Sequence, residues 1–199
     1  MDAVSSFALA SGLSWASGFR LYATVCVVGL LSYFNYLPLP QSLAILSHPV
    51  VIGVAGLLMV VEFLADKIPY VDSTWDAIQT FIRIPAGALL AMGAMNSADP
   101  MITTIAGLLG GSVAGITHAT KAGSRALINT SPEPVSNITT SLGEDGLWLG
   151  GGWLALFHPA IFIGVLALLM VVMLWMLPKL WRGLRLLLQK IRNLTGFST

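Results

Sequence analysis

Charged residues are scarce in this sequence. Asp, Glu, Lys and Arg together make up 10% of the 199 residues, whereas hydrophobic residues make up 56% and the mean hydropathy is +0.82. An ordinary soluble domain carries about a quarter charged residues. The composition therefore excludes such a domain and predicts an integral membrane protein.

Other missing features narrow the class further. The apolar runs are long and do not alternate with polar residues, which excludes barrel strands and predicts helices that satisfy their own backbone groups in lipid. A single cysteine, Cys26, excludes a disulfide framework. No Lys or Arg precedes the first apolar run, so we expect no cleaved signal peptide. With a net charge of +1 and no basic arm, we expect no nucleic-acid partner.

The apolar runs predict an all-α integral membrane protein with about five transmembrane helices of roughly 20 residues each, plus amphipathic helices. The predicted spans are 7–34, 50–65, 80–95, 101–120 and a last one that starts after 150–152 and ends near 177. Between them, 66–79 is expected to form a turn and a short amphipathic helix, and 121–146 a polar lid or ordered loop. Small residues in the third and fourth spans favour placing both at the centre of the bundle.

The whole chain is expected to form one membrane domain, 1–199, with two halves (about 1–97 and 98–177) and a basic amphipathic tail (178–199) on the membrane surface. An internal repeat indicates the halves. His48-Pro49 leads into GVAGLLMVVEFL, and His158-Pro159 leads into GVLALLMVVMLW. The basic tail predicts a cytoplasmic C-terminus. With five spans the matched segments would run antiparallel, which is typical of an inverted-topology repeat.

The stretch 61–83, VEFLADKIPYVDSTWDAIQTFIR, holds much of the negative charge. Glu62 and Asp66 are four residues apart, as are Asp72 and Asp76, so each pair would share a helix face. A carboxylate that ends an apolar run is costly in a membrane unless it is paired or faces water. Glu62 is therefore the leading candidate for a functional residue, whereas Asp72 and Asp76 taken alone are more typical of a solvated surface helix.

A basic stripe, formed by His118, Lys121 and Arg125 at i, i+3 and i+7, ends the fourth span. The predicted topology puts it at the same depth as Glu62 and Asp66, so the two stripes should meet. The same topology places Lys121 and Arg125 on the outer side, opposite the C-terminus.

Two further arginines require partners. Arg20 lies in the middle of the first predicted span, which predicts a kink, a re-entrant turn or a carboxylate partner there. Arg83 follows Asp76 by seven residues and could close that helix with an ion pair.

Three functions fit this pattern. The charges could form a cavity that binds an ion or an anionic head group, or a network that only locks helices together. The carboxylates could instead hold a divalent metal, with His118, Glu144 or Asp145, in an enzyme acting on a phosphate-containing lipid. We expect the protein to be a transporter. We assign no cofactor, catalytic residue or metal ligand. The glycine-rich helix faces would also permit the chain to form a homo-oligomer. The expected binding or ion-coupling residues are Glu62, Asp66, Lys67, His118, Lys121, Arg125 and Arg20, supported by Asp72, Asp76, Arg83, Glu144 and Asp145.

Several polar motifs resemble a bacterial membrane family labelled domain of unknown function 4126. They are GFRLY near Gly18, EFLADKIP followed by Asp72, FIRIPAGALLA, HATKAGSR, and the later Asn137, Ser141 and Glu144-Asp145. In this sequence Ile84 separates the Arg and the Pro that are often adjacent in the family pattern. The resemblance implies a multi-pass protein of the bacterial inner membrane. It marks Arg20, Glu62, Asp66, Lys67, Asp72, Arg83, His118, Lys121, Arg125 and Glu144 as motif positions without assigning roles.

Two short segments, the Glu-to-Ile-Pro stretch and FIRIPAG, are also similar to the DedA family of lipid and polyprenyl-phosphate translocases. This similarity implies an anionic lipid as a possible substrate, with Lys121, Arg125 and Arg20 facing its head group.

Overall fold

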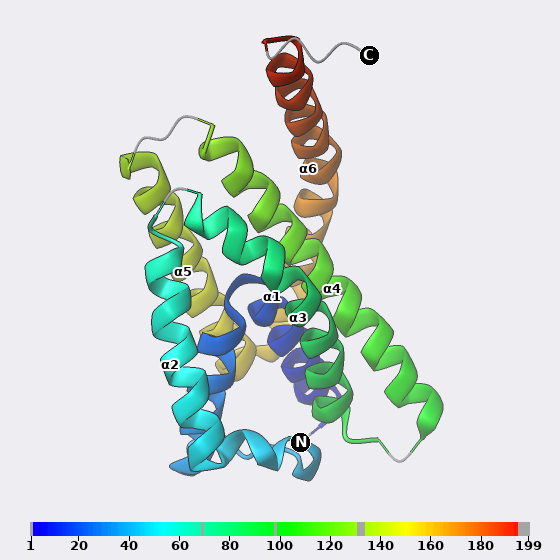
Figure 1. The fold of residues 1–199 in the computed structure, drawn as a ribbon. Helices are drawn as coiled ribbons and strands as arrows, with labels where there is room; N and C mark the ends of the chain where they lie inside the picture. The colour runs from blue at the N-terminus through cyan, green and yellow to red at the C-terminus, as the bar shows by residue number, and fades with distance from the viewer. Residues whose placement is uncertain (1, 69, 98, 131–133, 195–199) are drawn as a thin grey trace.

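The computed structural model describes residues 2–68, 70–97, 99–130 and 134–194, and within them every regular element is a helix (Figure 1). The predicted all-α class is therefore confirmed. The elements are α1 (Ala3–Tyr33), the 3-10 helix η1 (Gln41–Ser47), α2 (Pro49–Ala65), α3 (Val71–Met95), α4 (Pro100–Ile128), α5 (Pro134–Phe157) and α6 (Pro159–Leu194).

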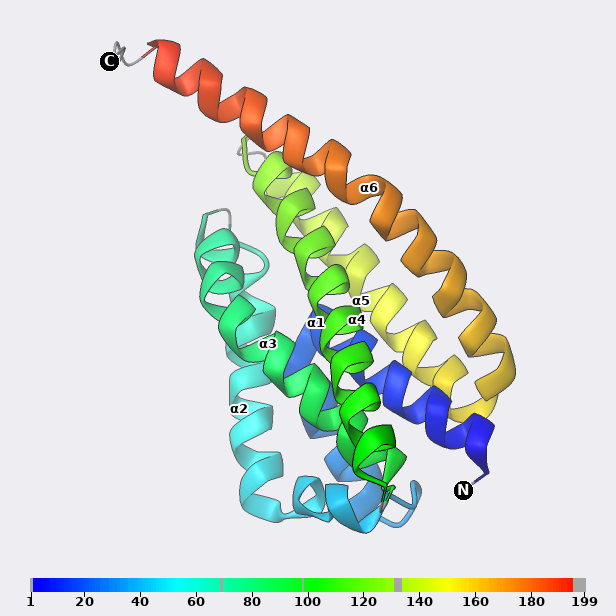
Figure 2. The same ribbon diagram turned by 90° about the vertical axis from the view of Figure 1, so that its right-hand side faces the viewer.

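The first helix is broken at Arg20 and turns back on itself. Arg20 has φ −145° and ψ 85°, well outside the helical region, while the residues on both sides are helical. Figures 1 and 2 both show the two halves of α1 leaving this bend toward the same end of the molecule. Leu9 and Leu31, from opposite halves, accordingly line one cavity together with Asp2 near the N-terminus. The predicted break at Arg20 is confirmed, and it has the form of a re-entrant hairpin.

The other long helices alternate in direction along the molecule. In Figures 1 and 2, α2, α4 and α6 run toward one end, which carries the turn after Asp66 and the far end of α6, and α3 and α5 run back. Lys121 near the end of α4 therefore lies at the same end as the basic tail. The prediction that Lys121 and Arg125 lie opposite the C-terminus is wrong, because a further helix, α5, runs back along the molecule between α4 and α6.

The matched repeat segments run in the same direction. Both α2 and α6 begin, after His48 and His158, at the end where the hairpin opens and finish at the opposite end (Figure 2). The antiparallel relation expected for these segments is therefore wrong. His48 itself caps α2, with its Nδ1 accepting from the Val50 N–H at 3.3 Å, as expected for a helix-entry residue.

Several helices are suited to a membrane. By length and composition α1, α3, α4 and α6 all qualify as spans, and η1 with α2, bent by 64°, forms a possible fifth, but α1 turns back at Arg20 and does not run straight through the bundle. Large apolar side chains such as Leu57, Leu168 and Trp175 are exposed on the outside of the bundle, where a bilayer would cover them. The chain is therefore compatible with a multi-pass membrane protein.

Helix boundaries differ from the prediction in three places. The expected amphipathic helix and third span are one continuous helix, α3. The expected loop 121–146 is the end of α4 and the first half of α5, because Asn137, Ser141 and Glu144 share one helix face and find buried polar partners there. The glycine triplet lies inside α5, and the last helix starts only at Pro159 and continues without a break through Pro178 into the basic tail.

Small residues let α3 and α4 cross closely at the centre, as predicted. A Cβ atom added to Gly87 would collide with Ala114, and one added to Gly110 would collide with Ala91. The close approach also lets the Ser14 hydroxyl of α1 donate to the Gly87 carbonyl at 3.0 Å. This three-helix crossing holds the α1 bend against α3 and α4, and it therefore positions Arg20 beside the charged ends of those helices.

Candidate functional site

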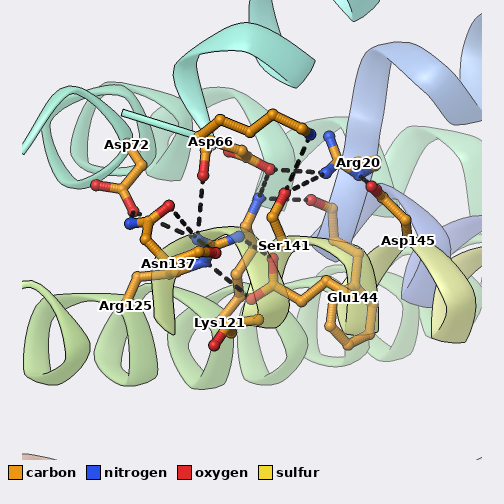
Figure 3. Close-up of polar contacts among 12 residues, drawn as sticks. Arg20, Asp66, Asp72, Lys121, Arg125, Asn137, Ser141, Glu144 and Asp145 are labelled. Carbon is orange, nitrogen blue, oxygen red and sulfur yellow. Dashed lines mark hydrogen bonds and ion pairs between the residues drawn. The ribbon is translucent and has the colours of Figure 1, made fainter. Parts of the chain in front are cut away.

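A buried cluster of charged side chains occupies the space where the α1 bend meets α2, α3, α4 and α5 (Figure 3). We call it the charged network. Eight ion pairs connect its members. Its charged members are Arg20, Glu62, Asp66, Asp72, Asp76, Arg83, Lys121, Arg125, Glu144 and Asp145.

Asp66, which follows the last turn of α2, bridges two cations. Its Oδ2 lies 2.9 Å from Lys121 Nζ and 3.1 Å from Arg20 Nη2. Arg20 also pairs with Asp145 of α5, and Lys121 Nζ donates to the Phe19 carbonyl at 3.2 Å, beside the bend in α1. The predicted contact between the acidic and basic stripes is therefore confirmed, and it is centred on the broken backbone of α1.

Arg83 of α3 holds a second group of partners. Its Nη2 lies 2.5 Å from Glu62 Oε1 and its Nη1 lies 3.1 Å from Asp76 Oδ1, which confirms the expected pairing with Asp76. Nη1 also lies 3.0 Å from His118 Nδ1. Because a guanidinium can only donate, Nδ1 must accept, and the ring proton is on Nε2, which lies 2.7 Å from the Thr80 hydroxyl. This arrangement assigns His118 as a neutral imidazole that orients Arg83.

Arg125 of α4 anchors α5 to α2 and α3. It binds Glu144 through two hydrogen bonds, Nε to Oε1 at 3.1 Å and Nη2 to Oε2 at 2.8 Å. Its Nη1 donates to the Asp66 carbonyl at 3.1 Å and to Asn137 Oδ1 at 3.1 Å, and it lies 3.6 Å from Asp72. Such a planar, bidentate arrangement uses the geometry of arginine, which a lysine could not reproduce.

Amide side chains complete the site around Asp72. Asn129 donates to Asp72 Oδ1 at 2.6 Å, and Asn137 donates to Asp72 Oδ2 at 3.1 Å. Asn129 was missed by sequence reasoning, although it follows Arg125 by four residues and so shares its helix face. Asp72 and Asp76 are 0% and 1% exposed, so the interpretation of these two as residues of a solvated surface helix is wrong.

Most of the network is closed to solvent, although the Asp145 side chain at its edge is 20% exposed. Glu62, Asp66, Arg83 and Arg125 are each 0% exposed. None of the five cavities we describe is lined by a charged member of the network within the described residues. The cavity predicted from the sequence to bind an ion or an anionic head group is thus not among these five, and most of the network is packed against its own opposite charges.

Charge compensation in the network is uneven. Six carboxylates share four ion-paired cations. Lys67 lies at the margin, where its Nζ is 3.4 Å from the Ser141 hydroxyl and 3.2 Å from the centre of the Phe63 ring. Among the described residues, three buried carboxylate oxygens have no hydrogen-bond donor: Glu62 Oε2, Asp66 Oδ1 and Asp76 Oδ2. The network therefore retains acceptor capacity for an additional positive group or proton.

A metal site does not emerge from this geometry. Within the described part of the chain, no group of three or more His, Cys, Asp or Glu side chains is arranged to hold a metal ion. Cations lie between the carboxylates that were considered as ligands, such as Lys121 between Asp66 and Asp76.

We expect low pH to destabilise the folded protein by protonating Asp66. Burial acts to raise the pKa of Asp66, but Lys121 and Arg20 outweigh it and hold the pKa below its ordinary value. A carboxyl with a lowered pKa contributes stability that is complete above the ordinary pKa and is lost as pH falls through the lowered one.

We therefore expect Asp66→Asn to lower the free energy of unfolding by about 3 kcal/mol at neutral pH, because two buried cations lose their shared partner. The variant should also lose less stability than the wild type between about pH 7 and pH 3, since the titrating group is gone. Denaturant unfolding in detergent micelles at both pH values checks this. Equal acid-induced losses in the two proteins would contradict the assignment to Asp66.

Comparison with known proteins places the chain in a family. The model of the family described as Domain of unknown function (DUF4126) matches residues 7–179, which include every charged member of the network. No curated protein and no solved structure matches the chain.

Proposed function

We propose that this chain, which belongs to the DUF4126 family, is a membrane transport protein that moves an ion or an anionic amphiphile by way of the charged network. One observation carries the proposal: a buried carboxylate, Asp66, bridges Arg20 at the bend of a re-entrant helix and Lys121 on α4. Discontinuous helices that meet buried charges inside a bundle are typical of substrate and ion sites in transporters.

The energetic argument favours a functional role. Charged groups inside a membrane bundle are costly, and they are found chiefly where they bind or relay charge. The small-residue crossing of α1, α3 and α4 already packs these helices closely without any charged side chain, so the nine buried charged residues are not needed for that contact.

In the proposed mechanism, Asp66 occupies the place of the transported anion. When Asp66 moves out of contact with Arg20 and Lys121, these two cations lose their shared negative partner and can bind an anionic group in its place. Arg125, held by Glu144, supplies a third cation nearby. Glu62, whose Oε2 has no donor among the described residues, is the carboxylate available to accept a proton as the coupling ion. Movement of α1 about its break at Arg20 would open the network toward one end.

Vesicle flux tests this proposal. Vesicles of phosphatidylcholine and NBD-labelled phosphatidylglycerol, loaded with the pH dye pyranine, would report lipid movement by dithionite quenching and proton movement by dye emission. We expect the wild type to accelerate at least one process over empty vesicles and Lys121→Ala to lose that activity. Lys179→Ala, which removes an equal charge from outside the network, is the matched control and should keep it.

A structural role is the second candidate, because each of the four cations in the network already has at least one carboxylate partner. That role predicts no flux from the wild type, and a loss of stability alone from Lys121→Ala. The metal-dependent enzyme considered from the sequence has no comparable support in the geometry of the described residues.

A further inference from the structure

An apolar groove of about 630 Å³ lies between α4 and the C-terminal half of α6, toward the end of the molecule that carries the basic tail. Small residues of α4 form its floor, and larger residues of α6 form one wall. They include Ala119, Ala122, Gly123 and Ala126 on α4 and Leu180 and Trp181 on α6. The floor lies on a different face of α4 from His118, Lys121 and Arg125, so the groove is separate from the charged network.

Unpaired basic residues accompany the groove wall. Lys179, Arg182 and Arg185 have no carboxylate partner among the described residues. The Arg185 guanidinium lies 5.8 Å from the centre of the Trp181 ring, and Trp181 itself lines the groove. A cation stacked on an exposed tryptophan is characteristic of the head-group level of a bilayer.

Lys179 points to a different side of α6. It stacks on Trp175, at 2.9 Å from the ring centre, and Trp175 does not line the groove. The same helix therefore carries two exposed cation–tryptophan pairs, one beside the groove and one away from it.

We propose that this groove binds one acyl chain of an anionic phospholipid, with the lipid phosphate held by Arg185 at the mouth of the groove. The apolar lining suits a hydrocarbon chain, and the unpaired cation at the rim suits the negative head group. The site holds a resident lipid against α4 and does not depend on the proposed transport function.

Lipid retention tests this inference. The protein would be reconstituted with equal amounts of phosphatidylglycerol and phosphatidylcholine that carry identical acyl chains, released gently from detergent and measured by native mass spectrometry. We expect one phosphatidylglycerol to be retained in preference to phosphatidylcholine. Arg185→Gln should reduce that preference about fivefold, since one Lys or Arg near the surface contributes about that factor toward an anionic lipid.

Matched variants separate the contribution of the Arg185 charge from that of the apolar groove. Lys179→Gln removes the same charge from the same helix but away from the groove, and it should retain phosphatidylglycerol like the wild type. Ala122→Phe fills the floor of the groove and should abolish retention of both lipids. Gly150→Phe adds the same ring on α5, where an added Cβ meets nothing within 4 Å, and it should change nothing.

Equal retention of the two lipids by the wild type would overturn the proposal, and so would an equal effect of Arg185→Gln and Lys179→Gln. If Ala122→Phe fails to fold, the two charge variants still decide the outcome. Arg185→Gln should leave proton and lipid flux in the vesicle assay unchanged, because Arg185 lies outside the charged network, so failure of the groove and failure of the transport site produce different results.

Discussion

Replacing Arg83 by Gln should destabilise the protein more than any other single change in the charged network. Arg83 is 0% exposed, and it is the only ion-pair partner of Glu62 among the described residues. It also supports Asp76 and donates to His118. Without Arg83, three paired cations remain for six carboxylates. No other donor takes its place beside Glu62 among the described residues. Breaking a buried ion pair from one side costs about 3–5 kcal/mol, and Arg83 serves two carboxylates, so we expect a loss at the upper end of that range.

The measurement is the free energy of unfolding in mixed micelles, titrated with denaturing detergent and followed by tryptophan fluorescence. Arg182→Gln is the control, because it removes the same charge from an exposed position on α6 that has no carboxylate partner in the described part of the chain. Surface changes of this kind are worth less than about 0.5 kcal/mol. Similar losses in Arg83→Gln and Arg182→Gln would contradict the ion-pair assignment.

The meeting of the two charged stripes was predictable because it depends on helix periodicity and on the cost of burying charge. Glu62 and Asp66 near the end of one helix, and Lys121 and Arg125 near the end of another, have few ways to be neutralised in lipid except by pairing. The break at Arg20 followed from the same argument, since an unpaired arginine in the middle of a straight span would be too costly.

The path of the chain was harder to predict. An apolar run of about 30 residues has the same composition whether it crosses the membrane or turns back, so α1 was counted as a span. The polar face of α5 was interpreted as a loop because Asn137, Ser141 and Glu144 are hydrophilic, and their partners on other helices cannot be seen in the sequence. The second error alone, the interpretation of the first half of α5 as a loop, reversed the predicted side of Lys121 relative to the C-terminus, because α5 adds one passage along the molecule between α4 and α6.

Glu62→Gln should have the opposite profile to Arg83→Gln, with stability preserved and transport lost. The amide has nearly the same shape as the carboxylate and can still accept from Arg83, which keeps Asp76 as its charged partner. The change also removes one of the surplus negative charges of the network, so the free energy of unfolding should change by less than about 1.5 kcal/mol. Glutamine cannot take up or release a proton, so any flux that is coupled to Glu62 should disappear.

The central claim is that the charged network moves charge or an anionic head group. Its most direct test compares flux by the wild type and by Glu62→Gln. Both proteins would be measured in the same pyranine-loaded vesicles with NBD-labelled phosphatidylglycerol. The amounts of folded protein would be matched by unfolding titration. The account predicts proton or lipid movement by the wild type and movement no faster than in empty vesicles for Glu62→Gln at equal stability. Equal flux from both proteins, or a wild type no faster than empty vesicles for both probes, would contradict it.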